Sequence, residues 1–180
     1  KQKLIAHKET ILSLLRGQSV PVDPEIPVVP RDAALECSFA QQRLWFLDQL
    51  EPGSWAYNLP LAVRLNGKLD VHALERTVTE IVRRHEALRT TFSVVDNTPV
   101  QNISTPSAVP LPLTDLSSLP KDERETEARL LAENEARLPF DLSRGPLLRA
   151  ALIKLSDKEH IALLTMHHII SDGWSSAAKP

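Results

Sequence analysis

The placement of proline constrains the fold of this chain more than any other sequence feature. The 180 residues include 14 prolines, yet none occurs within residues 61–98, 121–138 or 147–179. Because proline lacks a backbone N–H and interrupts helices and central strands, regular structure is expected in these three intervals. Four prolines instead fall between residues 21 and 30, so residues 1–35 are predicted to form a helical and Pro-rich linker between domains, with its helix over residues 4–16.

The spacing of apolar residues predicts helices and strands along the rest of the chain. Helices are expected over residues 38–50, 71–88 and 121–138, and strands over residues 59–65, 90–95, 100–103, 147–155 and 160–166. Asp70 is a favourable N-cap residue for the second of these helices. The last strand is apolar on both faces, so we expect it to lie at the centre of a sheet that is covered on both sides.

Charge and cysteine content exclude several classes of protein. Lys and Arg total 21 and Asp and Glu total 23, so a protein that binds nucleic acid through a basic surface is not expected. The single cysteine, Cys37, excludes an intrachain disulfide and a cysteine-based zinc cluster. No apolar run reaches the roughly 18 residues that a membrane-spanning helix needs, and residues 1–8 lack the apolar core that is typical of a signal peptide. We therefore expect a soluble, cytoplasmic protein with no membrane partner.

The residues with the clearest chemical potential follow the last predicted strand. His167 and His168 end this strand, and Asp172 and Gly173 lie a few residues later. Neighbouring side chains on a strand point to opposite faces, so one histidine is expected to face a cleft while the other supports it from the packed side. The side chain of histidine has an unperturbed pKa near working pH, which suits general acid–base catalysis.

The residue types alone leave other interpretations open. The two histidines could be hydrogen-bonded core residues that precede a turn. His168 and Asp172 could be two metal ligands, although no third ligand is evident. Ser171, Ser175 or Cys37 could act as a nucleophile with a histidine, but the chain has no Gly-x-Ser-x-Gly elbow.

Three ordered segments resemble the condensation domains of nonribosomal peptide synthetases. Residues 166–175, MHHIISDGWS, closely resemble the HHxxxDG motif of that family. Residues 38–47, SFAQQRLWFL, and residues 84–92, RHEALRTTF, resemble its first two motifs. The segments FDL at 140–142 and GPLLR at 145–149 are also typical of the family.

This resemblance implies an α/β fold (α+β, two-layer), namely a chloramphenicol acetyltransferase-like lobe with a mixed sheet flanked by helices. Residues 36–180 would be the N-terminal lobe, and the C-terminal lobe and later motifs are absent. Since the active site of the family lies between two lobes, this chain alone is expected to be inactive.

The implied reaction is amide formation between a donor thioester and an acceptor aminoacyl thioester. Upstream and downstream peptidyl carrier domains would deliver both substrates on phosphopantetheine arms, so no metal and no resident cofactor is expected. Other expected partners are the C-terminal lobe and neighbouring synthetase domains. Epimerisation, cyclisation and other acyltransferase reactions of the same fold remain alternatives, as does a fragment that only binds carrier domains.

The resemblance also assigns roles to individual residues. His168 matches the histidine that is assigned to catalysis, and His167 and Gly173 belong to the same catalytic motif. Asp172 matches an aspartate that is held by an arginine, for which Arg84 is the first candidate and Arg89 the second. Trp174 is expected to support the site by packing. The whole motif looks most like the subtype that joins L-configured units.

Overall fold

The fold is described here from a computed structural model, which describes residues 29–30 and 34–171. The chain divides into two compact units, Lys1–Asp32 and Ala33–Pro180, and the elements below all belong to the second. The helix predicted over residues 4–16 and most of the predicted linker lie outside the described residues. The predicted boundary between residues 35 and 36 therefore stays a prediction.

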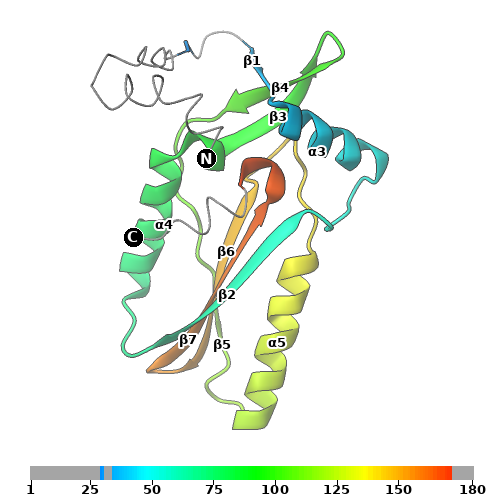
Figure 1. The fold of residues 1–180 in the computed structure, drawn as a ribbon. Coiled ribbons are helices and arrows are strands. Elements are labelled where there is room, and N and C mark those ends of the chain that lie inside the picture. The colour runs from blue at the N-terminus through cyan, green and yellow to red at the C-terminus, as the bar shows by residue number, and fades with distance from the viewer. Residues whose placement is uncertain (1–28, 31–33, 172–180) are drawn as a thin grey trace, which may run out of the picture. The chain divides into compact units, whose positions relative to one another are not determined.

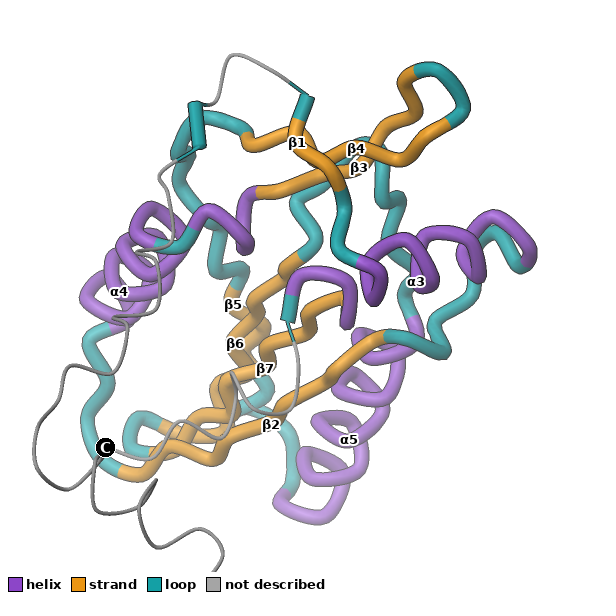
Figure 2. The backbone as a smooth tube through the Cα atoms, turned by 45° about the horizontal axis from the view of Figure 1, so that its top comes forward, coloured by secondary structure: helices purple, strands orange, loops and turns teal. Residues whose placement is uncertain are grey.

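Two separate sheets carry the strands (Figures 1 and 2). The four-stranded sheet has the order β2-β7-β6-β5, and the three-stranded sheet has the order β1-β4-β3. In the larger sheet β5 and β6 run parallel, whereas β7 is antiparallel to both β6 and β2, so this sheet is mixed, as predicted. The strand bounds are β1 Leu35–Glu36, β2 Asn58–Asn66, β3 Thr90–Val95, β4 Thr98–Ile103, β5 Leu113–Asp115, β6 Leu148–Ser156 and β7 Glu159–His167.

Side-chain caps mark the starts of two of the described helices, α3 and α4. The described helices are α3 Phe39–Leu50, α4 Val71–Arg84 and α5 Lys121–Arg137, with 3-10 turns η1 Glu86–Arg89 and η2 His168–Ile170. Ser38 and Gln41 form a reciprocal capping box at α3. The Asp70 side chain accepts the Ala73 N–H at 2.9 Å, which confirms the predicted cap of α4.

One helix end differs from the prediction. The apolar spacing continues to Leu88, but α4 ends at Arg84 because His85 adopts extended backbone angles. The 3-10 turn η1 follows and brings Leu88 against the core before β3 begins. The three-and-four spacing of apolar residues therefore extends past the end of α4, which is why the predicted helix was too long.

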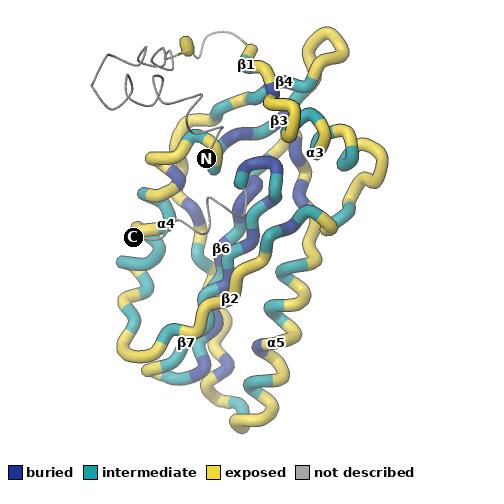
Figure 3. The backbone as a smooth tube through the Cα atoms, viewed as in Figure 1, coloured by how far each residue is buried: buried dark blue, intermediate teal, exposed yellow. Residues whose placement is uncertain are grey.

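The larger sheet has a hydrophobic core on each face. On one face, Ile153, Leu155 and Leu163 pack with Ala128 of α5. On the other face, Leu148 and Ala150 join residues of α3, α4, β3 and η2 in a second cluster. Strand β7 is central in the sheet order, as predicted, but its residues alternate between buried and half-buried (Figure 3). Its second face is thus only partly covered within the described part of the chain.

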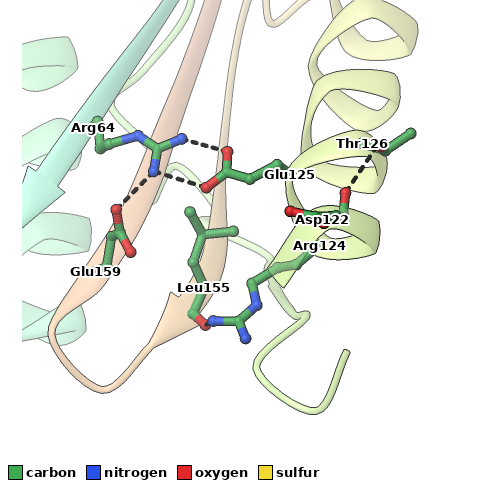
Figure 4. Close-up of polar contacts among 7 residues, drawn as sticks. All are labelled: Arg64, Asp122, Arg124, Glu125, Thr126, Leu155 and Glu159. Carbon is green, nitrogen blue, oxygen red and sulfur yellow. Dashed lines mark hydrogen bonds and ion pairs between the residues drawn. The ribbon is translucent and has the colours of Figure 1, made fainter. Parts of the chain in front are cut away.

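Polar contacts add to the attachment of α5 (Figure 4). The Arg64 guanidinium of β2 donates to both carboxylate oxygens of Glu125, at 3.1 and 2.7 Å, and to Glu159 at 2.6 Å. Arg124 donates to the carbonyl of Leu155 at the end of β6. Because the Arg64 pairs are exposed to solvent, the apolar cluster beneath them contributes more to stability than they do.

Candidate active site

The turn that carries the two histidines is anchored on both sides. The His167 N–H donates to the carbonyl of Leu147 at 3.0 Å, and the His168 N–H donates to the carbonyl of Tyr57 at 2.8 Å. Ile169 and Ile170, which complete η2, are buried in the core. Hydrogen bonds to neighbouring backbone and burial of the two isoleucines therefore fix the position of the turn that carries His167 and His168.

His167 occupies the packed side of the sheet. Its side chain lies on the same face of β7 as Leu163, toward α5, and the residue is only 3% exposed. The rings of Tyr57 and Phe140 lie beside it, with centroids 6.3 and 6.2 Å from its own. Its Nδ1 accepts the Ile169 N–H at 3.1 Å. Nδ1 therefore acts as an acceptor that caps the start of η2.

Burial also keeps His167 neutral. Loss of solvation, followed by the nearby His168, lowers the pKa of His167 from 6.5 to about 4. An imidazole that is uncharged near neutral pH and already accepts a backbone hydrogen bond is suited to holding the turn. This placement matches the supporting role that the alternation of strand side chains predicted for one of the two histidines.

His168 is half-buried and is oriented by one short hydrogen bond. Its Nδ1 lies 2.7 Å from the carbonyl oxygen of Ser171. A carbonyl oxygen can only accept, so Nδ1 must carry the proton of the neutral ring. The lone pair of the neutral imidazole is then on Nε2, which makes that atom able to accept a proton from a substrate.

The two candidate arginines differ strongly in their surroundings. Arg84 has a side chain that is 67% exposed and donates to Glu80 at 2.7 Å. Arg89 has a side chain that is only 15% exposed and donates to the carbonyl of Ser104. Asp172, Gly173 and Trp174 lie outside the described residues, so the predicted contact between Asp172 and an arginine stays a prediction.

The described residues bear on two alternatives left open by the sequence, a cysteine nucleophile and a metal site. Cys37 is buried, and burial raises the pKa of its thiol, so a reactive thiolate is disfavoured there. Residues 29–30 and 34–171 contain no group of three His, Cys, Asp or Glu side chains that could hold a metal ion. Within the same residues, no helix is long and apolar enough to cross a membrane.

Sequence reasoning did not place any side chain beside His167: it overlooked Asn58, and it singled out the segments that contain Phe140 and Arg149 without giving them a role at the site. Asn58 lies opposite His167 in the β2–β7 register, and its Nδ2 donates to the carbonyls of Ala136 and Leu138 at 2.8 Å each. Phe140 and Arg149 also belong to the surroundings of His167, and the Arg149 guanidinium carbon lies 3.8 Å from the centroid of the Phe140 ring. The available signal for Asn58 was a polar residue at the start of a largely apolar strand, and for Arg149 a charged residue within a strand.

The low pKa of His167 predicts that acid destabilises the fold. The unfolded chain binds a proton near pH 6.5 and the folded chain only near pH 4, so stability falls as pH decreases between these values. The full effect is about 3 kcal/mol below pH 4. His167→Asn keeps an acceptor for the Ile169 N–H but does not titrate.

We therefore expect the dependence of unfolding free energy on pH between 6.5 and 4.5 to be weaker in His167→Asn than in the wild type. Urea unfolding at several pH values measures this difference. An equal pH dependence in both proteins would show that His167 does not titrate with a depressed pKa.

Comparisons with known proteins agree on one family. The family model described as "Condensation domain" matches residues 32–178. Malpibaldin synthetase of Mortierella alpina is 49% identical over 150 residues, which cover 83% of this chain and 3% of that protein. Chondramide synthase cmdD of Chondromyces crocatus is 46% identical over 162 residues, covering 90% of this chain and 4% of that protein. The chain thus spans only a few per cent of these curated relatives.

Solved structures give the same result. The first condensation domain of the calcium-dependent antibiotic synthetase, in complex with a substrate analogue, has a TM-score of 0.74 at 25% identity, covering 82% of this chain and 37% of that chain. The starter condensation domain of rhizomide synthetase RzmA has a TM-score of 0.72 at 26% identity, covering 79% and 34%. The predicted fold class, a chloramphenicol acetyltransferase-like lobe with a mixed sheet and flanking helices, is confirmed.

Proposed function

The chain belongs to the condensation-domain family of nonribosomal peptide synthetases, and we propose that within a complete domain it takes part in amide formation between two carrier-bound thioesters. An upstream peptidyl carrier domain presents the donor acyl or peptidyl group, and a downstream carrier presents the acceptor aminoacyl group. The acceptor amine attacks the donor carbonyl carbon, a C–N bond forms, and the C–S bond breaks to release the donor thiol. Phosphopantetheine arms come with the carriers, so the chain itself holds no cofactor.

The orientation of His168 is the observation that carries this proposal. Nδ1–H donates to the Ser171 carbonyl, which leaves the Nε2 lone pair for the proton that the amine loses on attack. The same proton can then pass to the departing thiolate. No nucleophile on the protein is required, because the substrate amine supplies it.

The other motif residues complete the proposed site. His167 holds η2 in place through the Ile169 N–H. The family resemblance further implies that Asp172 would pair with Arg84 or Arg89, that Gly173 would bring its backbone close to the donor thioester, and that Trp174 would support the site by packing. The exposed position of Arg84, whose present partner is the surface carboxylate of Glu80, leaves it available to exchange partners.

The direct test is product analysis with a complete condensation domain that contains this chain. Donor and acceptor carriers are loaded, mixed with the domain, and followed by mass spectrometry of the carrier-bound products. We expect the donor group to appear on the acceptor carrier through a new amide bond. An acceptor loaded with the matching 2-hydroxy acid, which has no amine, is the control and should give no amide.

Other outcomes would favour the sister reactions. An epimerised donor with no transfer, or a heterocyclic product, would replace amide formation with epimerisation or cyclisation. Carrier binding without any turnover would favour a module that only docks carriers. The 180-residue chain alone is expected to give no product, and turnover by it would contradict the requirement for a second lobe.

A further inference from the structure

Arg149 of β6 is held in one orientation by several acceptors at the end of α5. Its Nε donates to the Glu135 carboxylate at 2.6 Å. Its terminal nitrogens donate to the carbonyls of Glu135, Leu138 and Pro139, at 3.1, 2.8 and 3.3 Å. These acceptors fix the plane of the guanidinium, and only a planar group with five donors can satisfy all of them together.

The fixed guanidinium covers a ring that touches the histidine turn. The Arg149 guanidinium carbon lies 3.8 Å from the centroid of the Phe140 ring. Phe140 is buried and meets the ring of His167 edge to face, at 83°. Stacking of a cation on an aromatic face and edge-to-face contact between rings both restrict orientation. Phe140 is therefore held between Arg149 and His167.

His167 passes this restraint to the turn that carries His168. Its Nδ1 can accept the Ile169 N–H only while its ring keeps its present orientation. If the Phe140 ring shifts, the His167 ring loses the surface that sets its tilt, and the start of η2 is released. The His168 N–H bond to Tyr57 and the Nδ1 contact with Ser171 depend on the same turn.

We propose that Arg149 is a positioning residue for the condensation reaction, acting through Phe140 and His167 on the orientation of His168. The inference rests on the proposed function, since it assumes that His168 is the proton acceptor. It differs from a purely structural role because it predicts that loss of the planar guanidinium changes which ring nitrogens of His167 and His168 carry the proton.

The test compares Arg149→Lys and Phe140→Leu with the wild type in the complete domain. Arg149→Lys keeps a cation near Glu135 but loses the planar group. We expect about a 10-fold lower kcat for amide formation with KM for both loaded carriers unchanged. The double variant should be no slower than the slower single variant, because both changes release one contact. Arg129→Lys, on an exposed position of α5, is the matched control and should leave kcat unchanged.

A second readout does not depend on turnover. The ¹⁵N shifts of the imidazole nitrogens report which atom of each histidine carries the proton. In the wild type we expect protonated Nδ1 in His168 and protonated Nε2 in His167, and in Arg149→Lys or Phe140→Leu a mixture of tautomers in both. Unchanged ¹⁵N shifts and a kcat within about 2-fold of the wild type in the variants that fold would overturn the proposal. If the shifts change but His168→Ala forms amide at the normal rate, the proposed function fails instead.

Discussion

Replacing His168 with alanine in the complete domain is expected to lower the rate of amide formation by about 10²- to 10⁴-fold, the usual contribution of a general base. The side chain is held by the carbonyl of Ser171 so that Nε2 is the basic atom of the neutral ring. Alanine removes Nε2, the proposed proton acceptor. The backbone N–H of residue 168 can still donate to the Tyr57 carbonyl. Single-turnover assays with pre-loaded carriers measure the chemical step directly.

His72→Ala is the matched control for this variant. His72 lies on α4 with a side chain that is 92% exposed, so its loss should leave the rate unchanged. Added imidazole separates two roles of His168, because a small base that restores part of the rate supports proton transfer over pure positioning. A folded His168→Ala domain that forms amide at the wild-type rate would remove His168 from the mechanism.

Much of the fold could be predicted because its signals are local. The cap at Asp70 and the turn between β3 and β4 at Asp96 and Asn97, which both have positive φ, depend on residues a few positions apart. The end of α4 could not be predicted in this way. His85 takes extended backbone angles although the apolar spacing continues, and Leu88 then packs against the core from the 3-10 turn that precedes β3.

The candidate site was predictable only in part, for a similar reason. His167 and His168 are adjacent in the sequence and follow a recognisable strand, so their motif identified them. Asn58 and Arg149 meet the end of α5 only after β2, β6 and β7 have paired, and no local pattern specifies that register. The bond between Arg64 and Glu125 spans 61 positions and was likewise missed.

Asn58→Asp is expected to destabilise the domain by about 3–5 kcal/mol at pH 7, the usual cost of a buried charge without a partner. Asn58 is 9% exposed, and its amide donates to the carbonyls of Ala136 and Leu138. The aspartate has the same shape but would place a carboxylate against two oxygen acceptors. These carbonyls also form the C-terminal end of α5, where the helix dipole disfavours negative charge.

The pH dependence of this variant distinguishes charge from shape. Burial and the two carbonyls should raise the folded pKa of the introduced carboxyl above its ordinary value of about 3.9. The folded state then binds more protons than the unfolded state, so the difference from the wild type should shrink as pH falls from 7 toward 5. Asn58→Ala, the uncharged control, should cost about 1–3 kcal/mol for its lost donors, with no such pH dependence. Urea unfolding at pH 7 and pH 5 gives these values.

The opposite result would be an unfolding free energy of Asn58→Asp within about 1 kcal/mol of the wild type at pH 7. A cost that small is close to that of an ordinary surface substitution, so it would mean that the amide does not hold the end of α5 against the histidine turn.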